Sequence, residues 1–275
     1  MLALGVVIEC KGSEMSRISV VMTHYNNAIY LADAVRSILD QLFSDVSLYL
    51  VDDNSPNNDW LDSIQDFLLD ARFHIYQSNV NVGTYRLKNA MLEMIDSEYI
   101  AFHDSDDISE PDRLLKQNDY LSNHKEVVLL GGAFYEVDEQ GRRSSTYMPY
   151  KPLVEFNDGG RYLSLHPTWC IRSKLLEELV GFDGKTRIAA DDEFLYRALY
   201  SGEVRNLSDY IYTKRIHSKS LTASSDTGFG SSMRIEYSRF IERQIMVLKN
   251  KKKDNNRQYL KARENNIDFK LSKLN

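Results

Sequence analysis

The chain has 275 residues, of which 43% are hydrophobic and 27% charged, and its formal net charge is −6 at pH 7. This length and balance are typical of a globular protein with a substantial core. Outside the C-terminal 45 residues the chain is acidic, which excludes nucleic acid as the partner of its body, because phosphate neutralisation needs a basic face. Its two cysteines, Cys10 and Cys170, are far apart and form no disulfide or zinc pattern, so we expect a cytoplasmic protein.

The two ends of the chain differ from the body. Residues 1–14 precede the first strand-like run and are expected to lie outside the fold; they lack the basic start and cleavage site of a signal peptide. No stretch approaches the ~20 apolar residues of a membrane span. Residues 231–275 carry 12 lysines and arginines against 5 acids. We expect an amphipathic helix over 233–248 and a weakly structured tail over 251–275, either solvated or touching anionic lipid at the inner face of a membrane.

The first 110 residues alternate strand-like and helix-like segments. Apolar and β-branched runs predict strands at 18–22, 48–51, 73–76 and 99–102. Apolar residues at helical spacing predict helices at 28–39, 59–69 and 84–95. This alternation is typical of an α/β fold with a mainly parallel central sheet and right-handed crossovers.

Polar residues follow the predicted strands. Thr23 and Tyr25 follow the first, Asp53 the second, and Asp104 with Asp106 the fourth. Because the carboxyl ends of parallel strands meet at one edge of the sheet, we expect these side chains to line a common crevice of nucleotide size. Asp53 taken alone would also suit a turn bonded to its own backbone.

Three carboxylates stand within four residues after the apolar run 99–102. Side chains alternate along an extended segment, so Asp104 and Asp106 are expected to share a hard cation while Asp107 points elsewhere. Asp107 or Ser109 could instead cap a helix that starts near Pro111. The Asp-x-Asp pattern also fits an aspartate nucleophile of phosphatase type, or, together with His103, the metal site of a hydrolase.

The second half has a smaller antiparallel portion. The pattern predicts helices at 112–124, 172–180 and 194–200, strands at 127–135, 166–171 and 210–216, a hairpin turn at 138–141 and a flexible loop at 224–232. Asp191 and Asp192 open the third of these helices, and His217 ends the strand that follows. We interpret His103 and His166 as structural and Trp169 as a core residue.

In this order the segments resemble the family-2 inverting glycosyltransferases of the GT-A fold, over about residues 18–222. Among relatives, the first segments look most like bacterial enzymes that use nucleotide sugars to build spore-coat, capsule or lipopolysaccharide glycans. The resemblance is carried by Ile18-Ser-Val-Val-Met-Thr-His-Tyr-Asn26, Val51-Asp-Asp-Asn-Ser55, Asn81-Val-Gly83 with Arg86 and Asn89, Asp104-Ser-Asp-Asp-Ile108 with Pro111-Asp-Arg-Leu114, Asp191-Asp-Glu-Phe-Leu-Tyr-Arg197 and Arg215-Ile-His-Ser-Lys-Ser-Leu-Thr222.

The resemblance implies a role for each matching position. Thr23, Tyr25 and Asp53 would hold the nucleoside of a nucleotide-sugar donor, and Arg86 would lie near the base or diphosphate. Asp104 would contact the ribose or the metal shell. Asp106 would bind Mn²⁺ or Mg²⁺, with His217 closing over the diphosphate or adding a metal ligand; Asp191 would be the catalytic base. The family commonly has Glu-Asp where this chain has Ala190-Asp191, and a register shift of one would make Asp192 the base instead.

Other functional classes fit the residues less well. A dinucleotide-dependent dehydrogenase is excluded because the loop after the first strand, residues 23–27, has no glycine. A phosphohydrolase predicts Thr or Val where Ile108 stands. A nucleotide-sugar-binding or scaffold protein of the same fold stays open as an alternative. The acceptor, a glycan or lipid-linked glycan by resemblance, would be chosen by loops such as 148–165, which carry no readable code.

Overall fold

The computed structural model describes residues 16–146, 164–218, 220–222, 225–228, 230–251, 261 and 267–275. The predicted N-terminal extension and most of the loop 148–165 lie outside these ranges.

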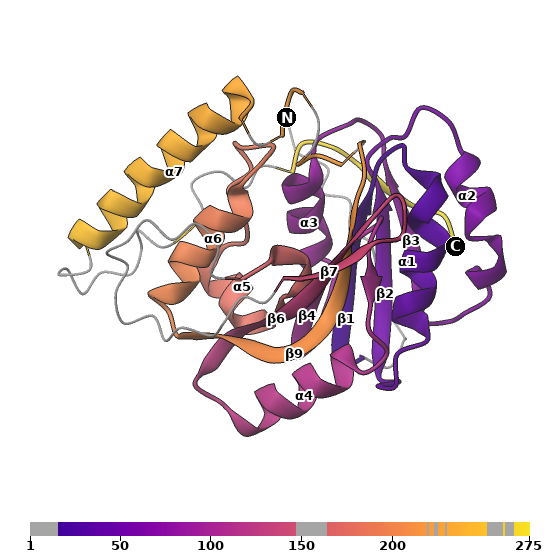
Figure 1. Ribbon diagram of the computed structural model, residues 1–275, viewed down its shortest axis with the longest axis horizontal. Coiled ribbons are helices and arrows are strands. Elements are labelled where there is room, and N and C mark those ends of the chain that lie inside the picture. Colours follow the sequence, from indigo (N-terminus) through magenta and orange to yellow (C-terminus); the bar gives the residue numbers. More distant parts are fainter. Residues whose placement is uncertain are drawn as a thin grey trace, which may run out of the picture.

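One large mixed sheet forms the centre of the molecule (Figure 1). Its parallel half runs in the order β3-β2-β1-β4, and β8, β6, β9 and β5 extend it beyond β4 with antiparallel pairings except between β6 and β9. The strands are β1 (Ile18–His24), β2 (Val46–Asp52), β3 (Phe73–Ser78), β4 (Tyr99–Asp104), β5 (Ile108–Ser109), β6 (Val127–Asp138), β7 (Arg143–Thr146), β8 (Cys170–Arg172), β9 (Glu203–Ile216) and β10 (Leu271–Lys273). This confirms the predicted fold class, including the hairpin, since β7 pairs with β6.

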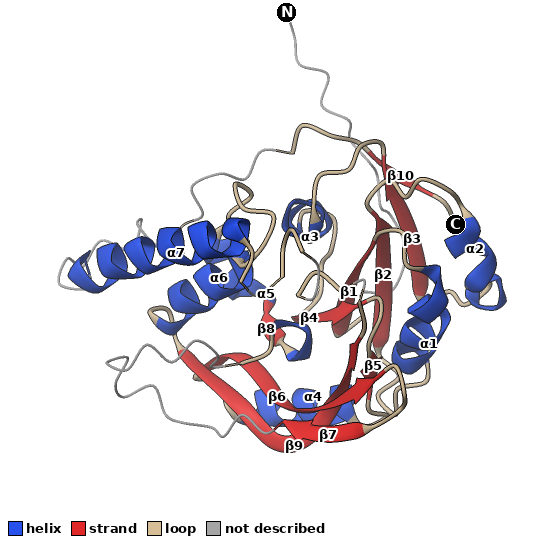
Figure 2. Ribbon diagram, turned by 45° about the horizontal axis from the view of Figure 1, so that its top comes forward, coloured by secondary structure: helices blue, strands red, loops and turns tan. Residues whose placement is uncertain are grey.

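Helices cover both faces of the sheet (Figure 2). On one face lie α1 (Ala28–Leu39), α2 (Asp59–Ser63) and α4 (Arg113–Asn123); on the other lie α3 (Thr84–Leu92), α5 (Ser173–Leu179) and α6 (Ala190–Leu199). Side chains alternate along β1, so Val20 and Met22 enter the first core and Val21 the second. A final helix, α7 (Ser232–Lys251), packs against α6. No helix in the described part of the chain has the length and apolar character needed to cross a bilayer.

Several predicted elements have different bounds, and the strand predicted over 210–216 already begins at Glu203. The helix predicted over 59–69 ends at Ser63 and is followed by a 3₁₀ turn, Gln65–Phe67. The strand predicted over 166–171 begins with a 3₁₀ turn, His166–Thr168, because Pro167 has no N–H to give to a ladder; only its end forms β8. The helix after Pro111 starts at Arg113, and neither Asp107 nor Ser109 caps it, since its N-cap is Asp112.

The prediction of a weakly structured tail is wrong for residues 267–275. They form the short edge strand β10, which is antiparallel to β3. The Asn275 side chain accepts from the Ile75 N–H (2.8 Å) and donates to the Phe73 carbonyl (2.7 Å). Lys270 and Asn79 exchange two further hydrogen bonds, and Phe269 is buried in the second core. The C-terminus therefore covers the β3 edge of the sheet and is fastened to the loop that leaves β3.

Replacing Phe269 by Ala tests this attachment. Because the ring is 9% exposed, we expect the Phe269→Ala variant to lose about 3 kcal/mol of unfolding free energy in urea. The matched control is Leu274→Ala in the same segment, where the side chain is 42% exposed and the loss should stay within about 0.5 kcal/mol. Equal stability of the two variants would show that the segment contributes no core packing.

Candidate active site

The parallel register brings the polar strand ends to one edge of the sheet. Thr23 of β1 stands opposite Asp104 of β4, and His24 stands opposite Asp52 of β2. Asp53 follows directly, and its N–H donates to the His24 carbonyl (2.8 Å). The structure thus gathers at this edge the residues that the sequence places at three separate strand ends.

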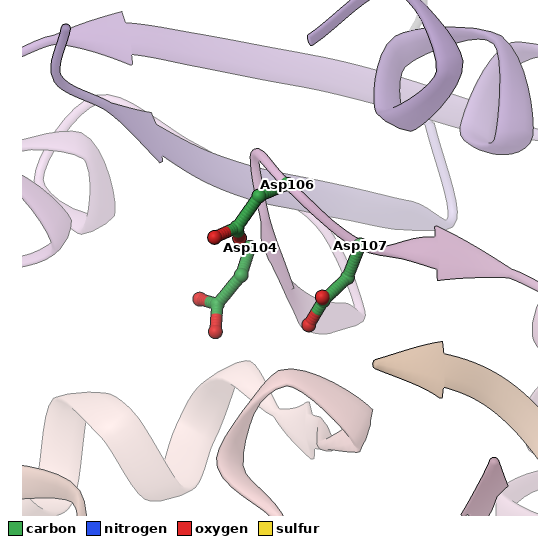
Figure 3. Close-up of side chains that lie close together, drawn as sticks. All are labelled: Asp104, Asp106 and Asp107. Carbon is green, nitrogen blue, oxygen red and sulfur yellow. The ribbon is translucent and has the colours of Figure 1, made fainter. Parts of the chain in front are cut away.

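The turn after β4 holds three carboxylates together (Figure 3). Ligand oxygens of Asp104, Asp106 and Asp107 all lie within 4.8 Å of one another. The prediction that Asp107 points away from the other two is wrong. Its two oxygens accept from the Tyr212 hydroxyl (2.9 Å) and from the Arg215 N–H (2.7 Å), so it fastens the turn to β9.

Burial makes this cluster costly when all its members are ionised. Burial, with the nearby Asp106 and Asp191 charges, raises the pKa of Asp104 to about 6, against the opposing effect of Lys88. The pKa of Asp107 is raised well above its usual value by burial and by the charges of Asp106 and Asp104. A bound cation would remove this repulsion.

The cluster has the ligands of a hard divalent cation. Carboxylate oxygens suit Mn²⁺ and Mg²⁺, and an imidazole is tolerated by Mn²⁺. His217, 5% exposed and directly after β9, approaches Asp106 with Nε2 2.8 Å from Oδ2. The carboxylates present therefore fit a hard divalent cation, and the His217 imidazole lies within hydrogen-bond distance of one of them.

Asp53 is bound to the loop that leads into α3. Its two oxygens accept from the N–H groups of Val82 (2.7 Å) and Gly83 (2.8 Å). Gly83 has φ of 92°, a conformation that suits glycine. Burial raises the pKa of Asp53, and these two hydrogen bonds oppose the rise. Each oxygen keeps a lone pair, so the carboxylate can hold the loop and accept one more N–H, such as that of a base.

The other residues predicted for the nucleoside have separate surroundings. The Thr23 hydroxyl lies 2.7 Å from that of Thr84, the first residue of α3. Tyr25 is 49% exposed, as a ring that stacks on a ligand would be. Arg86 forms an ion pair with Asp268 and lies 5.4 Å from the Phe269 ring, and both of these residues belong to the C-terminal segment.

Arg187 is a guanidinium beside Asp53 that the sequence analysis did not single out. It donates to the Asn81 carbonyl (3.1 Å) and side chain (2.9 Å), and its charge opposes the rise in the pKa of Asp53. Asn81 in turn donates to the Asp53 carbonyl (3.0 Å). Arg187 precedes α6 by only three residues, so it joins the nucleoside side of the site to the helix that carries Asp191.

Asp191, in the first turn of α6, faces the acidic turn. Its Oδ1 accepts from the Tyr85 hydroxyl at 2.5 Å. Its charge contributes to the raised pKa of Asp104, which places the two carboxylates in one electrostatic environment. The buried Lys88 interacts with both. The sequence analysis assigned no role to Tyr85 or Lys88, because neither stands in an acidic or metal-binding pattern.

Known proteins match this chain over most of the segments described above. The model described as Glycosyl transferase family 2 matches residues 19–180, more than half of the chain. The chain belongs to glycosyltransferase family 2. It is 31% identical over 189 residues to an uncharacterized glycosyltransferase of Methanocaldococcus jannaschii, covering 66% of this chain and 64% of that protein. It therefore spans a little under two thirds of that relative's length.

Solved structures share the fold of this family member. TarS from S. aureus in complex with UDP-GlcNAc matches with a TM-score of 0.67 at 22% identity, over 84% of this chain and 66% of that one. The mannosyltransferase PcManGT from Pyrobaculum calidifontis, in complex with GDP-Man and Mn²⁺, matches with a TM-score of 0.58 at 14% identity, over 89% and 66%. At these identities the likeness concerns the fold.

Two motif residues of this family member serve the structure rather than a ligand. The Asn89 side chain donates to the Phe182 carbonyl (2.8 Å) and accepts from its N–H (2.9 Å), tying α3 to the loop before α6. Arg197, 1% exposed, pairs with Glu193 and donates to the carbonyls of Leu179 and Gly181 (both 2.8 Å). Together these bonds fix where α6 begins and hence where Asp191 lies.

The raised pKa of Asp104 predicts a cost in stability without metal. The pKa of Asp104 is about 6 in the folded state against 3.8 ordinarily, so its carboxylate is ionised at neutral pH at a cost. This cost should destabilise the metal-free protein by roughly 1–2 kcal/mol after allowance for the partial exposure of Asp104. The Asp104→Asn variant should be more stable by that amount at pH 7. The gain should shrink between pH 6 and 4, where the folded-state carboxyl becomes protonated.

Urea unfolding of both proteins in chelator, at pH 7 and pH 4.5, measures this difference. Asp96→Asn, an exchange at an exposed position, is the control and should change nothing at either pH. A variant that is less stable than the wild type at pH 7 would show that Asp104 is favourably bound without any metal.

Proposed function

We propose that this protein is an inverting glycosyltransferase that moves a sugar from a nucleotide-sugar donor to a hydroxyl of a glycan or lipid-linked glycan. One observation carries the proposal: the carboxylates of Asp104, Asp106 and Asp107 lie within 4.8 Å of one another, and Asp104 interacts with Asp191 from a separate helix. A metal-assisted transfer needs this combination of a cation site and a nearby base. The complexes of TarS with UDP-GlcNAc and of PcManGT with GDP-Man and Mn²⁺ support it.

The donor would lie across the strand ends. Asp53, with its two loop N–H groups, would hold the base, and the exposed Tyr25 would stack on it. Thr23 would contact the nucleoside. The UDP complexes of TarS favour a UDP-sugar as donor.

Asp104, Asp106 and His217 would hold Mn²⁺ or Mg²⁺ beside the diphosphate. When bound, the cation would neutralise the negative charge that develops on the leaving phosphate. Asp107 would keep the turn in place through Tyr212 and Arg215.

Asp191 would act as general base on the opposite side of the sugar. Its carboxylate would take the proton of the acceptor hydroxyl as that oxygen bonds to the anomeric carbon and the bond to the phosphate oxygen breaks. One displacement inverts the anomeric configuration, as in inverting glycosidases. The Tyr85 and Lys88 contacts support Asp191 rather than Asp192 in this role.

A screen of nucleotide sugars by thermal shift, with and without Mn²⁺, tests the proposal. We expect a UDP-sugar to raise the midpoint only when the metal is present, and Asp106→Ala to abolish both this rise and UDP release. Asp66→Ala, exposed and distant in sequence, is the control. A chain that binds no nucleotide sugar contradicts the function; UDP binding with no turnover of any donor would make the chain a binding protein.

We further propose that the protein acts in the cytoplasm, with α7 touching the inner face of the membrane. Ile235 and Met246 are 46% and 65% exposed and lie three turns apart on one side of α7, with the exposed Arg239 and Glu242 between them. Exposed apolar side chains in a segment with 12 lysines and arginines against 5 acids suit an anionic lipid surface.

Cosedimentation with vesicles containing phosphatidylserine tests this contact. The double variant Ile235→Asp with Met246→Asp should lose most of the binding, because two charges would enter the apolar region. Leu69→Asp, at a 98% exposed leucine beside α2, should keep it. Wild-type protein that stays in the supernatant would refute the membrane contact.

A further inference from the structure

Two buried side chains of α3 approach Asp191 from one side. Tyr85 and Lys88 stand three residues apart, so they project from the same face of the helix. Their exposed fractions are 7% and 1%. Lys88 Nζ lies 5.8 Å from the centre of the Tyr85 ring and 5.5 Å from that of Phe102 in β4. The two residues thus form one packed unit.

The Tyr85 hydroxyl is held to Asp191 as a donor. Burial and the Asp191 charge raise the pKa of Tyr85 well above its usual value, so the phenol keeps its proton. It donates to Asp191 Oδ1 at 2.5 Å. This leaves Oδ2 as the oxygen with the greater capacity to receive a proton.

Lys88 is buried, and burial disfavours the charged form of its side chain. Burial lowers the pKa of Lys88, and the charges of Asp104 and Asp191 oppose that change. A buried ammonium is costly unless carboxylates compensate it. Here the two compensating carboxylates come from different elements, since Asp104 ends β4 and Asp191 begins α6.

We propose that Tyr85 and Lys88 are positioning residues for sugar transfer: Tyr85 orients the Asp191 carboxylate, and the charge of Lys88, held beside the Tyr85 and Phe102 rings, offsets the repulsion between Asp191 and Asp104. The inference rests on the proposed function, in which Asp191 is the base. A near-attack geometry tolerates little displacement. A less firmly oriented Asp191 carboxylate should therefore slow the reaction without lowering the affinity for the donor.

Tyr85→Phe is the principal test, because it removes one hydroxyl and keeps the ring against Phe182, whose centre is 5.5 Å away. Loss of a hydrogen bond to a charged group should slow UDP release from UDP-GlcNAc with Mn²⁺, at saturating donor, about 10- to 100-fold. The UDP dissociation constant by calorimetry should stay within about twofold of wild type. Tyr99→Phe is the matched control: Tyr99 is fully buried at the opposite end of β4 and should keep the full rate.

Lys88 is tested by a pair of variants. Lys88→Met removes the charge and should slow UDP release at least as much as Tyr85→Phe. Lys88→Arg keeps the charge and should recover part of the rate. If Lys88→Met fails to fold, the comparison of Lys88→Arg with Tyr85→Phe decides, since a folded Lys88→Arg slower than Tyr85→Phe contradicts the charge role.

Asp191→Asn separates failure of this inference from failure of the proposed function. The variant should bind UDP normally and release almost none from the donor. If it works at the wild-type rate, Asp191 is not the base and the proposed mechanism is wrong. If it is inactive while Tyr85→Phe keeps the wild-type rate, the base is right and the positioning role is refuted.

Discussion

The structure depends on holding several carboxylates close together where they are partly or fully buried from solvent. Asp104, Asp106 and Asp107 occupy one turn, and Asp191 of α6 interacts with Asp104. Like charges at such distances repel strongly when water is scarce. The chain compensates with cations drawn from three elements, Lys88 of α3, Arg113 of α4 and Lys214 of β9. Arg113, which is fully buried, donates to the carbonyls of Phe102 (2.9 Å) and Trp169 (3.4 Å) and so fixes the strand end from which the turn departs.

The acidic groups divide into those the protein uses itself and those left for a ligand. Both oxygens of Asp107 are bound by β9, and both oxygens of Asp53 by the loop before α3. Asp107 therefore fixes the turn against β9, and Asp53 fixes the loop before α3. In contrast, the Asp106 carboxylate meets the His217 imidazole, and among the described residues Asp104 has no pair of hydrogen-bond donors like those of Asp107 and Asp53. Repulsion that the protein leaves uncompensated would favour the binding of a divalent cation in the proposed site.

Much of this could be predicted from the sequence, because the decisive signals were local. Apolar strands that end in Thr23, Asp53 and Asp104 fix the edge of the sheet where the polar groups meet, and the structure confirms it. The direction of Asp107 could not be predicted, since a turn reverses the alternation on which that prediction relied. The pairing of Arg86 with Asp268 joins residues far apart in the sequence, and β10 is too short to show a period. Lys88 reads as an ordinary helix surface residue until the packing of β4 and α6 around it is known.

Helix α3 connects the separate parts of the site. Thr84 meets Thr23 at the end of β1, Tyr85 meets Asp191, Arg86 meets Asp268 of the C-terminal segment, and Asn89 meets Phe182 before α6. Consecutive residues of a helix cannot move independently, because each is fixed by the same ladder of backbone hydrogen bonds. A displacement of α3 would therefore move the donor side and the Asp191 side together. In the proposed mechanism, α3 would therefore set the distance between a donor bound at the strand ends and the carboxylate of Asp191. A nucleoside bound at Asp53 would contact the Gly83 loop, which leads directly into α3.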